Sequence, residues 1–137
     1  MNLKISEHQH QKAVIQWARI MEHRYTPLKW MYAIPNGGAR HIVAARKLKA
    51  EGVKAGVPDL CLPYPIVYNG GKKPLMSGEV TQWHGLYIEM KTKGGAVNPD
   101  QKEWIKYLLS VGYMVAVCWT AEEAIQELTN YLEGTTR

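Results

Sequence analysis

Glu89 and Lys91 are the residues whose types and spacing most clearly suggest chemistry. They lie two positions apart in Glu89-Met90-Lys91, directly after the apolar residues 86–88, which predict a strand. Because side chains alternate between the faces of a strand, Glu89 and Lys91 share one face and Met90 lies on the other. A carboxylate near the buried end of a strand is costly unless it is paired or binds a metal ion. Glu89 is therefore a candidate metal ligand, or simply the partner of Lys91.

Two further acids could join Glu89. Asp59 interrupts the apolar run 57–62, and it would meet Glu89 at the edge of the sheet if the two strands are neighbours. Glu7 precedes Val14 by seven residues in a predicted helix, so we expect Glu7 near the core-facing stripe of that helix. The alternative for Glu7 is an acid favoured by the helix dipole at the first turn.

Three carboxylates that converge on one point form a set of hard oxygen ligands, which Mg²⁺ and Mn²⁺ prefer. The backbone carbonyl of Met90 could supply one more oxygen. Beside such an ion, Lys91 could position or deprotonate an attacking water and offset the charge of a phosphate. The set therefore suits metal-assisted hydrolysis at a phosphate.

The elements that must position these residues follow from periodicity and turn signals. The sequence predicts helices at about 7–23 and 41–51, from Pro99 to about 111, and from Thr120 to about 133. It predicts strands at 28–34, 57–62, 86–91 and 113–119, with a hairpin insertion at about 64–85. Helices that alternate with strands predict an α/β sandwich, a central mixed sheet flanked by helices, in one domain spanning 1–137.

The charge pattern favours a polyanionic partner. The formal net charge is +5, and five cations lie between positions 40 and 54 against one acid, Glu51. They are Arg40, Arg46, Lys47, Lys49 and Lys54. In the helix predicted there, Ile42, Ala45 and Leu48 would face inward and the cations outward. Such a face can bind phosphates or can simply be solvated.

Other features exclude function classes. Cys61 and Cys118 are far apart, and no clustered Cys and His residues suggest a zinc site, so we expect two buried free thiols. No apolar stretch is long enough to span a membrane, and the N-terminal residues do not form a signal peptide. We therefore expect a cytoplasmic protein without a membrane partner.

These residues carry a resemblance to a known family. Pro58-Asp59 followed by Glu89-x-Lys91 resembles the PD-(D/E)xK nuclease signature, and the chain as a whole resembles the VRR-NUC (virus-type replication-repair nuclease) family. The family-like stretches are Ile34-Pro35-Asn36-Gly37-Gly38, residues 48–60, residues 99–104 and Gly112-Tyr113. The resemblance covers nearly the whole chain in order, apart from the segment at about 64–84.

The resemblance implies a restriction-endonuclease-like fold and a Mg²⁺- or Mn²⁺-dependent endonuclease that hydrolyses DNA. It implies that Glu7, Asp59 and Glu89 hold metal and that Lys91 assists catalysis. Gln101 matches a polar residue of the family and would support Lys91 or a phosphate. Stand-alone members of this size are similar to phage-encoded, homodimeric Holliday-junction resolvases, which implies branched DNA as substrate in replication, repair or recombination. An inactive DNA-binding module and a sequence-specific, restriction-type nuclease are the alternatives.

Overall fold

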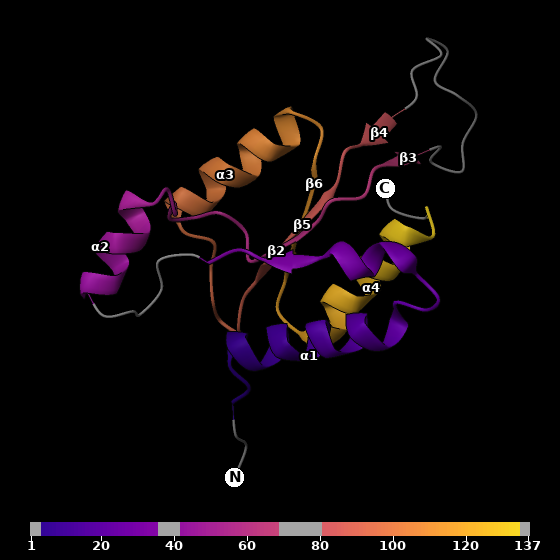
Figure 1. Ribbon diagram of the computed structural model, residues 1–137, viewed down its shortest axis with the longest axis horizontal. Helices are drawn as coiled ribbons and strands as arrows, with labels where there is room; N and C mark the ends of the chain where they lie inside the picture. Colours follow the sequence, from indigo (N-terminus) through magenta and orange to yellow (C-terminus); the bar gives the residue numbers. More distant parts are fainter. Residues whose placement is uncertain (1–3, 36–41, 69–80, 135–137) are drawn as a thin grey trace.

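A mixed β-sheet lies between two layers of helices (Figure 1). The computed structural model describes residues 4–35, 42–68 and 81–134. Its helices are α1 (Glu7–Met21), α2 (Ile42–Ala50), α3 (Pro99–Ser110) and α4 (Ala121–Leu132), with a 3₁₀ helix η1 (Thr26–Trp30). Its strands are β1 (Tyr32–Ala33), β2 (Leu60–Leu62), β3 (Ile66–Tyr68), β4 (Thr81–Trp83), β5 (Leu86–Met90) and β6 (Met114–Cys118).

The main sheet has the strand order β1-β2-β5-β6. β2 is antiparallel to both of its neighbours, whereas β5 and β6 are parallel and are connected through α3. β2 pairs with β5 so that Leu60 lies opposite Ile88. Continued by one residue, this register sets Asp59 opposite Glu89. The α/β fold with a central mixed sheet flanked by helices is confirmed.

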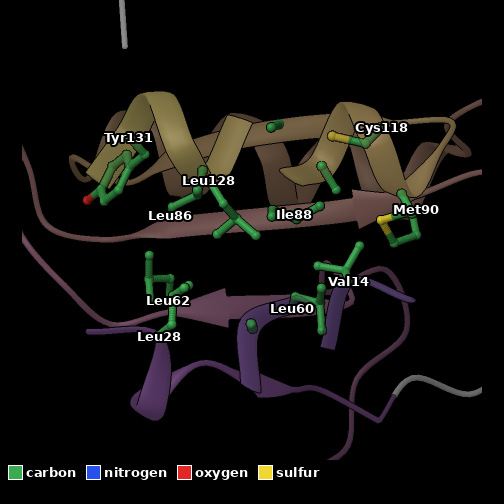
Figure 2. Close-up of a cluster of buried hydrophobic side chains, with 14 of the residues drawn as sticks. Val14, Leu28, Leu60, Leu62, Leu86, Ile88, Met90, Cys118, Leu128 and Tyr131 are labelled. Atoms are coloured by element: carbon green, nitrogen blue, oxygen red, sulfur yellow. The ribbon is translucent and has the colours of Figure 1, made fainter. Parts of the chain in front are cut away.

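The hydrophobic core lies on one face of this sheet, against α1 and α4 (Figure 2). It includes Leu60 and Leu62 of β2 and alternate residues of β5, namely Leu86, Ile88 and Met90, all of them at most 1% exposed. Burying an aliphatic side chain of this size stabilises the fold by about 1.5–3 kcal/mol. Since β5 alternates, Glu89 must face the opposite side of the sheet, where α3 packs.

Side-chain caps fix the start of three helices where the sequence predicts them. Ser6 and Gln9 form a reciprocal capping box at α1, and Asn98 and Gln101 form another at α3. Thr120 accepts a hydrogen bond from the N–H of Glu123 at α4. The α3 cap is the one that matters for the site, because it fixes the first turn of the helix that faces Glu89.

The strand predicted at 28–34 is wrong over its first half. Residues 26–30 form η1, and only Tyr32 and Ala33 form β1. Pro27 lies in the first turn of η1, where its fixed φ favours a helical start, and Leu28 is buried at 2% exposure. The apolar residues that alternate here therefore belong in part to a short helix, which buries Leu28. β2 is also shorter than predicted, since it begins after Pro58 and Asp59.

The second helix lies far from the core, contrary to prediction. α2 begins at Ile42, and none of its residues is buried. Ile42 is 68% exposed, so its inward orientation was wrong, whereas Ala45 and Leu48 are half-buried. Ala45 and Leu48 instead line a pocket with Val53 and Trp104. Arg40 and His41 lie outside the described residues.

The predicted hairpin is represented by β3 and β4, which pair antiparallel with Ile66 opposite Trp83. Residues 69–80 between them lie outside the described part of the chain. Cys61 and Cys118 are buried free thiols, as expected. Among the described residues, no helix is both long and apolar enough to cross a membrane.

Candidate active site at the end of β5

Asp59 is tied to the last residue of β5. Its Oδ2 accepts a hydrogen bond from the backbone N–H of Met90 at 2.7 Å. Its own backbone carbonyl accepts from the N–H of Ile34 at 2.8 Å, which extends the β1–β2 ladder. The carboxylate of Asp59 is therefore oriented by two strands, directly beside Glu89.

Glu89 is buried, with 2% of its surface exposed, yet only half of its carboxylate is satisfied. Oε1 accepts a hydrogen bond from Nε2 of Gln101 at 2.8 Å and lies 3.8 Å from Nζ of Lys91. Oε2 is buried and has no hydrogen-bond partner among the described residues. A buried carboxylate oxygen without a donor is costly, and such an atom calls for an explanation.

The pKa of Glu89 also indicates that its negative charge is poorly compensated in the folded protein. Burial, followed by the negative charge of Asp59, raises the pKa of Glu89 to about 8 against the attraction of Lys91. Two carboxylates that share one buried site cannot both ionise cheaply unless a cation joins them.

Gln101 links the cap of α3 to this carboxylate. Its Oε1 accepts from the backbone N–H of Asn98 at 2.9 Å, and its Nε2 donates to Glu89. Because the first bond requires the amide oxygen, the second position must be the amide nitrogen. Gln101 was expected to support Lys91 or a phosphate, but in the structure its partner is Glu89. The capping-box spacing from Asn98 to Gln101 indicates the role of Gln101 at the start of α3, but not its contact with Glu89, which depends on how α3 packs on the sheet.

Lys91 lies on the same face as Glu89, as the spacing predicts. Its residue is 8% exposed, and its backbone N–H donates to the carbonyl of Cys118 at 2.8 Å. This bond continues the β5–β6 ladder by one residue beyond β5, so the backbone of Lys91 is fixed by the sheet. The buried ammonium of Lys91 beside the carboxylate of Glu89 balances part of its charge.

Glu7 lies seven residues before the buried Val14 on α1. It is exposed in the first turn of α1, although its charge contributes to the raised pKa of Glu89. Only Val14 and Ala18 of α1 are buried, so the first turn extends beyond the sheet. Over residues 4–35, 42–68 and 81–134, no three Asp, Glu, His or Cys side chains are grouped so that they could hold a metal ion. The structure thus joins Asp59 and Glu89, and Glu7 as a ligand stays a prediction.

The residues present nevertheless fit a hard divalent cation. Mg²⁺ is commonly held by one or two carboxylates and keeps several of its waters. Asp59 and Glu89 supply such a pair, and the unpartnered Oε2 of Glu89 is an acceptor that a cation would satisfy. The alternative way to neutralise the site is the proton that the raised pKa already indicates.

The predicted DNA-binding cations lie on and after α2. Arg46, Lys47, Lys49 and Lys54 are all exposed, and Arg40 lies outside the described residues. Lys49 and Lys54 also line a pocket with Trp104 of α3, a residue to which the sequence analysis assigned no function.

Comparisons with known proteins find matches over most of the chain. The model of the VRR-NUC domain family matches residues 3–122 of the chain. A solved structure described as a VRR_NUC domain protein superposes with a TM-score of 0.69 and is 25% identical, with 96% of this chain and 92% of that chain covered. No curated protein matches the chain.

Proposed function

The chain belongs to the VRR-NUC domain family of nuclease-type domains, and we propose that it is a Mg²⁺- or Mn²⁺-dependent DNA endonuclease selective for branched DNA. The observation that carries this proposal is the half-satisfied carboxylate of Glu89: Gln101 holds one oxygen, while the other has no donor within the described part of the chain. Next to Asp59, that oxygen is a place for a cation rather than for a further side chain.

The proposed ligands are the carboxylates of Asp59 and Glu89, with Glu7 and the backbone carbonyl of Met90 as further candidates. A divalent ion bound there would polarise a phosphate oxygen and lower the pKa of a bound water. Asp59 is held in place by the Met90 N–H, and Glu89 by the Gln101 amide. Pre-oriented ligands of this kind lower the reorganisation that binding a cation requires.

Lys91 is the proposed catalytic partner. Its ammonium lies 3.8 Å from Oε1 of Glu89. It is therefore close to the proposed cation site but leaves Oε2 of Glu89 available to the cation. There it would orient the attacking water and offset the negative charge that develops on the scissile phosphate. Gln101 touches Glu89 rather than the reacting atoms, so we assign it a positioning role.

Selectivity for branched DNA and a homodimeric assembly complete the proposal. The net charge of +5 and the exposed lysines of α2 support binding to a phosphate backbone. A dimer with two equivalent sites would match the symmetry of a four-way junction.

A cleavage panel tests the substrate class. Four-way junction, flap, splayed-arm and blunt duplex DNA are incubated with the protein and Mg²⁺ or Mn²⁺, and the products are mapped on sequencing gels. We expect cuts in at least one branched substrate at low enzyme and none in the duplex. A discrete pattern of cuts on duplex, with the branched substrates intact, would instead indicate a sequence-specific nuclease. DNA binding without cleavage of any substrate would indicate an inactive binding module.

A further inference from the structure

A pocket of about 540 Å³ separates α2 and the turn after it from α3. Its lining includes Ala45, Leu48 and Val53 on one side and Trp104 on the other, with Lys49 and Lys54 among the remaining residues. The volume lies within the range of small-ligand sites. Figure 1 shows α2 next to the N-terminal end of α3, the end that carries Gln101.

The charges around Trp104 differ between its two sides. Among the residues that the structure describes, the pocket towards α2 is lined by two lysines and no acid. The neighbouring pocket, which Trp104 also lines, has Asp100 and Glu103 in its wall, against a single lysine, Lys106. A polyanion is therefore favoured on the α2 side of the indole and disfavoured on the other.

The indole ring is also held in place. Tyr107 packs edge-on against Trp104, with ring centroids 6.4 Å apart and planes at 88°. A ring held by its neighbour loses less conformational freedom when a flat ligand stacks on it. The pocket thus offers an oriented aromatic ring together with two lysines among its lining residues.

This pocket is coupled to the candidate active site by short covalent paths. Trp104 follows Gln101 by three residues on α3, so both side chains lie on neighbouring positions of one helix surface. On the other side, the chain from Lys54 leads through Gly56 to Asp59. Gly56 has a φ of +90°, and a Cβ there would lie 2.7 Å from the backbone carbon of Asp100, so this segment is packed tightly on α3.

We propose that the pocket receives an unpaired nucleobase of the DNA substrate, one or two nucleotides from the scissile phosphate. The base would stack on Trp104, and Lys49 and Lys54 would contact the adjoining phosphates. Stacking of a base on an aromatic side chain tolerates any sequence, because every base has a π-face. The inference rests on the proposed nuclease function and deepens it, since a pocket for an unpaired base selects branched DNA with unpaired strands, such as splayed arms and flaps, over duplex DNA.

The experiment uses 2-aminopurine, a fluorescent base, as the probe. It is placed in turn at each unpaired position of a splayed-arm DNA, and the DNA is bound to the full chain carrying Lys91→Ala, so that it stays uncut. We expect a change of emission at one position next to the cut site mapped with the parent protein. Trp104→Leu should abolish this change and weaken binding of splayed-arm DNA about tenfold, with blunt duplex affected less than about twofold.

Two further variants serve as controls for the effect of Trp104→Leu. Trp30→Leu removes a tryptophan that is 66% exposed on η1 and does not line this pocket, and it should leave the signal intact. Trp104→Phe retains a stacking ring and should recover much of the signal, which separates loss of stacking from loss of folding.

Three results would overturn the inference. One is an emission that is the same at every unpaired position, or that survives Trp104→Leu. Another is an equal loss of splayed-arm and duplex binding in that variant. The third is a molar mass of Trp104→Leu in light scattering that differs from that of the parent. This result would show that the pocket contacts a second copy of the chain. If the parent cuts a branched substrate and any of these occurs, only the pocket is refuted. If the parent cuts no DNA, the proposed function itself fails.

Discussion

The side-chain amide of Gln101 donates from Nε2 to Oε1 of Glu89 at 2.8 Å while its own Oε1 caps the backbone at Asn98. One residue therefore starts α3 and orients a candidate metal ligand. Because the amide oxygen of Gln101 accepts the hydrogen bond of the cap, its amide nitrogen is directed towards Glu89. The hydrogen bond from this nitrogen orients the Glu89 carboxylate. The position of the ligand thus depends on how the helix begins.

Replacing Gln101 should therefore affect chemistry more than folding. Gln101→Ala leaves Oε1 of Glu89 without its donor, and loss of such a supporting contact typically costs about 10–100-fold in metal affinity or activity. Asn98→Ala is the matched control, because it removes the side-chain half of the cap but keeps the backbone N–H that Gln101 accepts from. It should cost about 1 kcal/mol of stability and little activity. Equal losses of cleavage rate in the two variants would contradict a positioning role for Gln101.

Burial of Glu89 should make the metal-free protein less stable as the pH rises. Its folded-state pKa of about 8 lies above the ordinary value of 4.5, so the folded protein binds the extra proton. The stability that this proton contributes is complete below about pH 4.5 and is lost as the pH rises to about 8. Glu89→Gln should match the parent near pH 4.5 and exceed its free energy of unfolding by about 2–4 kcal/mol at pH 8.

Urea unfolding in EDTA at both pH values measures this difference. Glu103→Gln, at an exposed position of α3, is the control and should show the same stability relative to the parent at both pH values. A Glu89→Gln variant that is less stable than the parent at pH 8 would show that the ionised carboxylate is satisfied in the folded protein.

Binding of a divalent cation should be linked to release of the proton from Glu89. Below about pH 8 the cation must displace that proton, so the apparent Kd for Mg²⁺ should fall about tenfold for each unit that the pH rises towards 8. Thermal stabilisation by Mg²⁺ at pH 6, 7 and 8 reads out this dependence without DNA. Glu89→Gln should abolish the stabilisation, and an unchanged Kd across this range would place the cation elsewhere.

The lysines next to the pocket should account for part of the salt dependence of DNA binding. Lys49→Gln combined with Lys54→Gln should reduce the slope of log Kobs against log salt concentration by about 1.8, that is about 0.9 for each phosphate contact. The control replaces Lys12 and Lys29, two exposed lysines on α1 and η1, with glutamine. Identical slopes for the two double variants would mean that the net charge alone attracts the DNA.

Much of the fold could be predicted because local signals and burial agree. The apolar strands β2 and β5 and the caps at Ser6, Asn98 and Thr120 leave few alternatives. The segment at 28–34 shows where local reading fails, since alternating apolar residues after Pro27 fit a strand or a 3₁₀ turn, and the burial of Leu28 decides between them. The predicted inward orientation of Ile42 on α2 was wrong for a related reason. A sequence shows which face of a helix is apolar but not how far that face lies from the core.

The site could be predicted only as far as strand geometry reaches. The placement of Glu89 and Lys91 on one face needs only the period of a strand, and the meeting with Asp59 needs only that β2 and β5 are neighbours. The exposure of Glu7 and the contact of Gln101 with Glu89 depend on where α1 and α3 lie against the sheet. Packing between elements decides this, and no spacing within one element encodes it.

Metal-dependent cleavage of DNA tests most directly whether Asp59, Glu89 and Lys91 form a nuclease site. A branched DNA is incubated with Mg²⁺ or Mn²⁺ and with the parent, Asp59→Asn, Glu89→Gln, Lys91→Ala or, as a surface control, Lys29→Ala. We expect cleavage by the parent and by Lys29→Ala that EDTA abolishes, with a loss of at least about 100-fold in each of the three site variants. Cleavage by Lys91→Ala or Glu89→Gln at the rate of the parent would contradict this expectation.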